Sequence, residues 1–221
     1  MTLSRRSLLQ LSGGLAAGAL TSSLPVHAAD GEVPPALASL QPMTAGVEPI
    51  TVDEHRARIA RAQALMRTEG LEAVVLAAGT GLTYFTGAEW GASERLFAAV
   101  VPRDGEPAWV CPAFEKARGL EQIRIGSDVR AWEEHESPFA LVAGILRDRA
   151  AVGTVGIEEY LPFTFAHAIG AALPGARLVP ATPVTAGCRM IKDAHEIALM
   201  RRANEITVHA HRAVFRSLRE G

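Results

Sequence analysis

The sequence predicts a three-layer α/β protein, in which helices cover both faces of a mixed β-sheet and a long C-terminal helix follows. Three observations predict this class. Short apolar runs alternate along the chain with helical segments of about ten residues. The first run, residues 71–78, lacks polar alternation, which is typical of a strand buried on both faces. Residues 103–106 have turn chemistry between two apolar runs, which predicts an antiparallel pair within the sheet.

Composition narrows the functional classes. The chain has 221 residues, 48% of them hydrophobic and 21% charged, which is enough apolar content for a buried core. Its net charge of -2 argues against a nucleic-acid-binding protein, because such proteins carry an excess of positive charge. Two cysteines, Cys111 and Cys188, have no zinc-binding spacing. An oxidising compartment would permit a bond between them, and two buried free thiols are the alternative.

The first 28 residues have the anatomy of a signal peptide. Arg5 and Arg6 precede a mildly apolar run that ends in small residues at 26–29, where cleavage after Ala28 or Ala29 fits. The segment resembles a twin-arginine export signal. It predicts a periplasmic or secreted protein with no stable membrane span after cleavage. A permanent membrane anchor is the alternative, although the glycines and Pro25 disfavour it.

Residues 29–50 contain four prolines and little periodicity, so they are expected to form an extended linker. The domain then begins with a predicted helix over residues 52–69. Thr51 and Glu54 have the spacing of a capping box, and Gly70 stands where a left-handed C-cap belongs. The remaining strands and helices follow from the apolar runs between turn signals. Further strands are expected at 96–101, 107–111, 129–132, 154–158 and 177–179. Further helices are expected at 114–123, 138–149 and 163–173.

The last predicted element is a helix of nearly thirty residues that starts at the capping pair Asp193 and Glu196. At about 1.5 Å per residue it would be roughly 40 Å long, more than a domain of this size can cover. Its second half is therefore expected to need another partner. Its apolar stripe consists of Ile197, Met200, Ala203, Ile206, Ala210, Val214 and Leu218.

Several catalytic motifs fail on inspection. Gly79 and Gly81 begin a dinucleotide fingerprint, but Tyr84 occupies the place of the third glycine. Residues 91–95 begin like a nucleophile elbow and lack its closing glycine. The seven histidines form no HExxH motif, so solvated helix positions are favoured over metal ligation.

The acidic clusters also lack a catalytic arrangement. The charged cluster at residues 133–136 is assigned to a solvated loop and given no role. Glu158 and Glu159 are adjacent at a strand end and face opposite ways, which makes them a poor acid/base pair. The sequence therefore predicts neither a catalytic residue nor a metal ligand in this chain.

Three stretches together resemble the N-terminal domain of the creatinase, prolidase and Xaa-Pro aminopeptidase family. The first is GLTYFTG at 81–87, followed by ERLF at 94–97. The second is VGIE at 155–158, and the third runs from Arg189-Met-Ile-Lys-Asp to Ala203. The third stretch is similar to the family's passage between its two domains. The resemblance implies a creatinase-like N-terminal α/β domain over 51–186, and an inter-domain passage with the first helix of a pita-bread catalytic domain over 187–221.

In that family the N-terminal domain is non-catalytic, contributes oligomer contacts and overhangs the active site. A pair of divalent ions, manganese, cobalt or zinc, is bound by the catalytic domain. The resemblance thus implies that metal and catalysis belong to a domain missing after Gly221, so that this chain alone is inactive. The expected partners are that pita-bread domain or a second copy of the chain, and the full-length substrate is a proline-containing peptide or small amide. A self-sufficient periplasmic α/β binding module without activity is the alternative.

The resemblance also implies one substrate-binding role. In creatinase-type relatives an arginine shortly after the Tyr-x-x-Gly segment binds a substrate carboxylate, and Arg95 stands at the matching place. Tyr84 and Trp90 are candidates to wall the same cleft. The alternatives are that Arg95 starts a strand with its guanidinium in water and that both aromatic side chains belong to the core.

Overall fold

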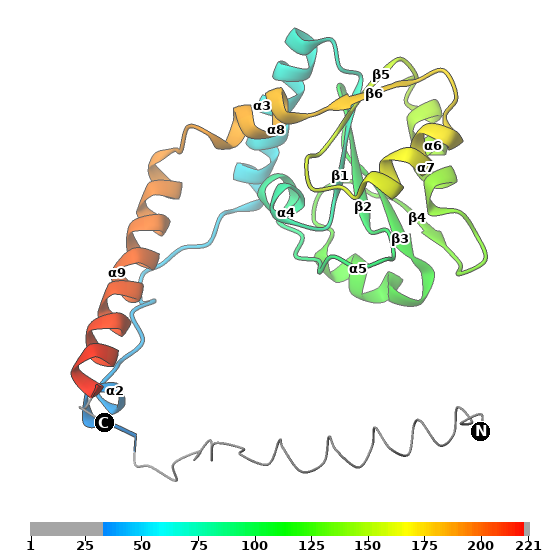
Figure 1. The fold of residues 1–221 in the computed structure, drawn as a ribbon. Coiled ribbons are helices and arrows are strands. Elements are labelled where there is room, and N and C mark those ends of the chain that lie inside the picture. The colour runs from blue at the N-terminus through cyan, green and yellow to red at the C-terminus, as the bar shows by residue number, and fades with distance from the viewer. Residues whose placement is uncertain (1–32, 219–221) are drawn as a thin grey trace, which may run out of the picture. The chain divides into compact units, whose positions relative to one another are not determined.

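A six-stranded mixed sheet, in the order β4-β3-β2-β1-β5-β6, is surrounded by helices in the main folded unit (Figure 1). The computed structural model describes residues 33–218, so the predicted signal peptide lies outside the described residues. The strands are β1 Ala73–Ala77, β2 Ala98–Pro102, β3 Ala108–Pro112, β4 Asp128–Trp132, β5 Thr154–Ile157 and β6 Arg177–Pro180. The sheet belongs to a unit spanning Gly46–Met200, and the described residues on either side of it, 33–45 and 201–218, belong to a second unit.

Strand pairing confirms the prediction of a mixed sheet. β1 pairs antiparallel with β2, with Val75 opposite Val100, and β2 pairs antiparallel with β3 across the expected turn. The pairs β1–β5, β5–β6 and β3–β4 are parallel. Every residue of β1 is buried, as its unbroken apolar run predicted, whereas the edge strand β6 is partly exposed.

Helices cover both faces of the sheet, which confirms the three-layer α/β class (Figure 1). The helices of the Gly46–Met200 unit are α3 Val52–Glu69, α4 Thr80–Thr86, α5 Lys116–Gln122, α6 Pro138–Asp148, α7 Phe163–Ala172 and α8 Thr182–Arg189. A 3₁₀ turn, Ala113–Glu115, precedes α5. One core cluster, with Met66 and Phe85, packs α3, α4 and α8 on the sheet. The other, with Leu146 and Ile169, packs α6 and α7 on the opposite face.

The predicted start and end of α3 are confirmed in detail. The Glu54 amide donates to Thr51 Oγ1 at 3.2 Å, and the Thr51 amide donates to Glu54 Oε2 at 2.7 Å. These two bonds satisfy amides that a helix start otherwise leaves unpaired. At the other end Gly70 has φ 69°, the left-handed conformation that glycine adopts at least cost.

Three helices were not predicted. Seven-residue α4 follows β1 and has no side-chain cap at its start, so its sequence lacks the usual signal. Eight-residue α8 likewise has no side-chain cap. The segment predicted as an extended linker contains a single helical turn, α2 Pro35–Ala38, because a proline at the first helical position already has a suitable φ.

The long last helix, α9, spans Ala194–Ser217. Its predicted capping pair is confirmed, since the Glu196 amide donates to Asp193 Oδ1 at 2.8 Å and the Asp193 amide to Glu196 Oε2 at 3.0 Å. At 24 residues it is shorter than the predicted length of nearly thirty. Across residues 33–218, no helix is long and apolar enough to cross a membrane.

The two cysteines are buried free thiols, one of the two alternatives that the sequence left open. Burial raises the pKa of Cys111 to about 11 and also raises the pKa of Cys188. A thiol with a raised pKa is a poor nucleophile at neutral pH, because the thiolate is the reactive form.

Candidate functional site

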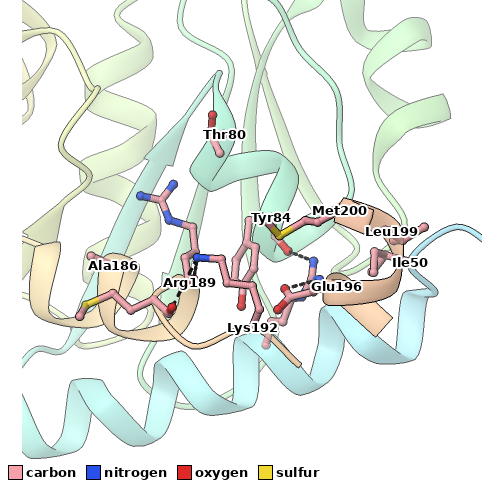
Figure 2. A pocket seen from close by; sticks show the side chains of 11 residues that line it. Ile50, Thr80, Tyr84, Ala186, Arg189, Lys192, Glu196, Leu199 and Met200 are labelled. Carbon is pink, nitrogen blue, oxygen red and sulfur yellow. Dashed lines mark hydrogen bonds and ion pairs between the residues drawn. The ribbon is translucent and has the colours of Figure 1, made fainter. Parts of the chain in front are cut away.

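The candidate site is a cavity of about 590 Å³ between α3, α4, α8 and the start of α9 (Figure 2). All of its lining residues belong to the Gly46–Met200 unit. They are Ile50, Arg58, Thr80, Tyr84, Ala186, Arg189, Met190, Lys192, Glu196, Leu199 and Met200. A cavity of this size fits a small organic molecule.

Tyr84, a predicted site residue, forms one wall of this cavity from α4. Its hydroxyl donates to the Cys188 carbonyl oxygen at 3.0 Å, and the Arg58 guanidinium lies 4.2 Å from the centre of its ring. The Tyr84 carbonyl oxygen accepts a bond from Arg58 at 2.9 Å and lies 3.0 Å from His55 Nδ1. Burial raises the pKa of the Tyr84 phenol. Tyr84 therefore holds α4 against α3 and α8.

An ion pair between Arg58 and Glu196 lies next to Tyr84 in the same lining. Arg58 Nη2 lies 2.7 Å from Glu196 Oε1, and the two side chains are only 10% and 13% exposed. The second carboxylate oxygen of Glu196 accepts a hydrogen bond from the Asp193 amide, just before α9 begins. The Glu196 side chain thus caps α9 and attaches the start of α9 to α3.

A second ion pair links the same two helices. His195 Nδ1 lies 2.6 Å from Glu54 Oε1, and its Nε2 lies 3.1 Å from the Glu48 carbonyl oxygen. The Glu54 carboxylate raises the pKa of His195, and the pKa of Glu54 is lowered to about 2, chiefly by His195 and then by Thr51. His195 is partly exposed, whereas His55 on α3 is only 8% exposed, so the expectation of solvated helix positions is wrong for His55.

Arg95, the predicted carboxylate-binding residue, does not line this cavity. Its Nε donates to Glu134 Oε1 at 2.8 Å, and its guanidinium also pairs with Glu94 and lies 5.4 Å from the Phe114 ring centre. The Glu134 bond is the largest cause of the raised pKa of Arg95. The cluster at residues 133–136, to which the sequence assigned no role, therefore supplies a partner to Arg95.

Trp90 belongs to the core, which was the alternative weighed for it. Its ring stacks on Phe97 with centroids 4.0 Å apart, and the Arg118 guanidinium lies 4.3 Å from the ring centre. Trp90 is only 8% exposed. The structure does not bring Tyr84, Trp90 and Arg95 together around the candidate site, and the substrate-binding role of Arg95 stays a prediction.

Comparisons with known proteins decide the family. Residues 58–191 match the model of the Creatinase/Prolidase N-terminal domain, more than half of the chain. The chain belongs to the creatinase/prolidase N-terminal domain family. It is 33% identical over 160 residues to the "Probable dipeptidase PepE" of Mycobacterium tuberculosis, which covers 71% of this chain and 42% of that protein. The chain thus spans about two fifths of the length of this curated relative.

Solved structures agree with this family. The dipeptidase PepE of Mycobacterium ulcerans matches with a TM-score of 0.61 and 29% identity, over 68% of this chain and 40% of that one. The prolidase of Thermococcus sibiricus matches with a TM-score of 0.60 and 25% identity, over the same shares. The N-terminal domain of the Xaa-Pro dipeptidase from Lactobacillus brevis is covered over 99% of its length, with a TM-score of 0.54. At 22% identity, that last likeness shows the fold alone.

Within residues 33–218, no group of three or more His, Cys, Asp or Glu side chains is arranged to hold an ion. The acidic pair at the end of β5 is not such a set. Glu158 is 1% exposed and its carboxylate oxygens make no hydrogen bond to described residues, whereas Glu159 is exposed and accepts from Thr185 at 2.7 Å. The two carboxyls face different surroundings, as their positions predicted.

Sequence inspection missed Arg58 and Arg189 as lining residues of the cavity. Arg58 and Glu196 are 138 residues apart, and no local pattern reports a contact across that separation. The sequence did single out the motif around Arg189. The family resemblance, however, assigned that motif only to the passage between two domains. In this creatinase/prolidase N-terminal domain, the motif also lines the cavity.

Proposed function

We propose that this chain is the non-catalytic N-terminal domain of an exported Xaa-Pro dipeptidase-like enzyme. It holds the substrate-facing edge of the active site, and a pita-bread domain supplies the divalent ions and the hydrolysis. That domain is provided by further polypeptide or by a partner chain. The observation that carries the proposal is the match of residues 58–191 to the family's N-terminal domain, with only two fifths of PepE covered.

Arg95 is the residue that acts on substrate in this proposal. Its side chain is 39% exposed and lies in the segment after Tyr84 that the family resemblance singled out. Two carboxylates already hold it in place, so its fork is pre-oriented at the surface. A substrate carboxylate binds by exchanging with one of these exposed partners, at small cost because surface ion pairs are weak.

A chimera tests this role. The segment of Mycobacterium tuberculosis PepE that this chain matches is replaced by the corresponding segment of this chain, and hydrolysis of Leu-Pro is measured with manganese. We expect activity, and we expect Arg95→Gln to raise KM about tenfold or more, since a charge-assisted bond to the carboxylate is lost. Arg177→Gln, a change at an exposed arginine on the edge strand, is the control. A folded chimera without activity would contradict the proposed domain role, and an unchanged KM for Arg95→Gln would contradict the role of this arginine.

Export through the twin-arginine pathway is the second part of the proposal. It is supported by Arg5 and Arg6 ahead of an apolar run and a small-residue cleavage site. Changing both arginines to lysine keeps the charge and removes the pair that the pathway recognises. We expect the full chain to appear in the periplasm of a bacterium with this pathway, and the double variant to stay in the cytoplasm. Equal export of both would refute this part.

A second function, ligand binding without catalysis, is favoured by one observation: the candidate site contains an arginine without a bonding partner among the described residues. This function requires no second domain.

A further inference from the structure

The cavity between α3, α4, α8 and α9 has apolar walls and an excess of positive charge. Five of its eleven lining residues are apolar: Ile50, Ala186, Met190, Leu199 and Met200. Four are charged: Arg58, Arg189, Lys192 and Glu196. Glu196 is the one acidic side chain in this lining, and its carboxylate already pairs with Arg58 at 2.7 Å. Two cations, Arg189 and Lys192, therefore face the cavity without a carboxylate in the lining to balance them.

Lys192 bonds to carbonyl oxygens and to no carboxylate among the described residues. Its Nζ donates to the carbonyl oxygen of Arg189 at 2.6 Å and to that of Met190 at 3.4 Å. Carbonyl oxygens orient an ammonium group but do not neutralise it. The Lys192 ammonium thus contributes a full positive charge at this end of the cavity.

Arg189 is the group with unused bonding capacity. Its guanidinium makes no hydrogen bond or ion pair with residues 33–218. In Figure 2 this guanidinium extends on the side of Thr80, away from the Lys192 ammonium. An arginine fork has five donors, and a partly buried one normally finds an acceptor.

Two carboxylates lie within electrostatic reach of Arg189 without pairing with it. The charge of Arg189 acts to lower the pKa of Glu158 and of Glu159. Glu159, however, accepts its hydrogen bond from Thr185. Burial raises the pKa of Glu158, which disfavours its charged form. The donors of Arg189 consequently stay open to an acceptor that enters the cavity.

We propose that this cavity binds a small organic monocarboxylate with an apolar body. The carboxylate accepts a forked pair of bonds from Arg189, Lys192 adds long-range attraction, and the apolar body packs on Met190 and Leu199. The apolar lining disfavours phosphate, which has no apolar body, and the charge excludes amines. Two kinds of ligand carry a carboxylate on an apolar body: a free acid, and a peptide that ends in an apolar residue with a free C-terminus. The proposal does not depend on the proposed enzyme function.

Calorimetric titration of the full chain at low ionic strength tests the proposal. The probe is N-acetyl-L-leucine, and the matched neutral ligand is N-acetyl-L-leucinamide. We expect the acid to bind at least tenfold more tightly than the amide. Acetate, which lacks the apolar body, is expected to bind more weakly than N-acetyl-L-leucine. Equal affinity for acid and amide, or for acetate and N-acetyl-L-leucine, overturns the proposal without any variant.

Variants assign the binding to the cavity. Arg189→Gln is expected to reduce affinity for N-acetyl-L-leucine at least tenfold, and Lys192→Gln a few-fold. Arg212→Gln, at an exposed arginine elsewhere on α9, is the control and is expected to change nothing. If Arg189→Gln fails to fold, Arg189→Lys keeps the charge and removes the fork, and a loss of at least threefold is expected. Wild-type affinity in a folded Arg189 variant overturns the proposal.

A longer ligand distinguishes binding of a free acid from binding of a peptide C-terminus. N-acetyl-Ala-Ala-Leu carries the same terminal carboxylate on a longer peptide. Tighter binding of the peptide supports a peptide C-terminus as the ligand, and tighter binding of N-acetyl-L-leucine supports a free acid. Failure of both to bind overturns the proposal and leaves the proposed enzyme function intact, since that function is tested through Arg95 and the chimera.

Discussion

Gly81, in the first turn of α4, is a residue at which an added side chain would collide with a buried neighbour. A Cβ there would lie 2.9 Å from Glu158 Cδ and closer still to its Oε1. Glu158 is buried, so its carboxyl group cannot move into solvent to make room. We expect Gly81→Ala to lower the free energy of unfolding by about 1–3 kcal/mol, as overpacking does.

Urea unfolding followed by circular dichroism measures this effect, with Gly91→Ala as the control. A Cβ on Gly91 would meet nothing within 4 Å, so that change is expected to stay within about 0.5 kcal/mol of wild type. If Gly81→Ala is as stable as Gly91→Ala, the close packing of α4 on Glu158 is wrong.

At the scale of elements, the Arg58–Glu196 pair is the main polar link between α3 and the start of α9. Arg58 also donates to the Tyr84 carbonyl oxygen and covers its ring. We expect Arg58→Met to lower the free energy of unfolding by about 2–4 kcal/mol, because the nearly buried carboxylate of Glu196 loses its counter-charge.

Chemical unfolding compares Arg58→Met with Arg56→Met on the same helix. Arg56 pairs with Glu106 at 3.5 Å, but both side chains are about half exposed, and a change below about 0.5 kcal/mol is expected. A double-mutant cycle with Glu196→Gln should return a coupling of about 1–3 kcal/mol. Equal effects of the two arginine changes would contradict a special role for Arg58.

The ion pair between His195 and Glu54, the second link between α3 and α9, predicts that the stability of the fold depends on pH. The pKa of His195 is raised above its ordinary value of 6.5. The stability that His195 adds to the folded state is therefore fully present below pH 6.5 and is lost as pH rises through the raised pKa. The pKa of Glu54 is lowered from 4.5 to about 2. The stability that Glu54 adds to the folded state is therefore fully present above pH 4.5 and is lost as pH falls toward 2. The link is therefore strongest between about pH 4.5 and 6.5.

His195→Gln tests this dependence. The stability difference between wild type and the variant is expected to be larger at pH 5.5 than at pH 8.5, while His209→Gln, at an exposed position of α9, shows no such change. A difference independent of pH would mean that His195 does not pair with Glu54 in solution.

At the scale of the whole molecule, the sequence predicted most of the layered fold and little of the site. Capping pairs and apolar runs located α3, α9 and all six strands, since these signals are local. Helix α4 was missed because it is short and lacks a capping side chain. The cavity was missed because Arg58 and Glu196 meet only after the chain folds, and Tyr84 was predicted as a site residue through resemblance alone.

The central claim is that this chain carries a creatinase/prolidase N-terminal domain and leaves metal-dependent hydrolysis to another domain. The most direct measurement incubates the purified full chain with manganese and records bound metal by dialysis together with cleavage of Leu-Pro. Mycobacterium tuberculosis PepE is assayed in parallel. We predict no stoichiometric metal uptake and no cleavage above the buffer rate. Bound manganese at one or two ions per chain, together with turnover, would contradict the account.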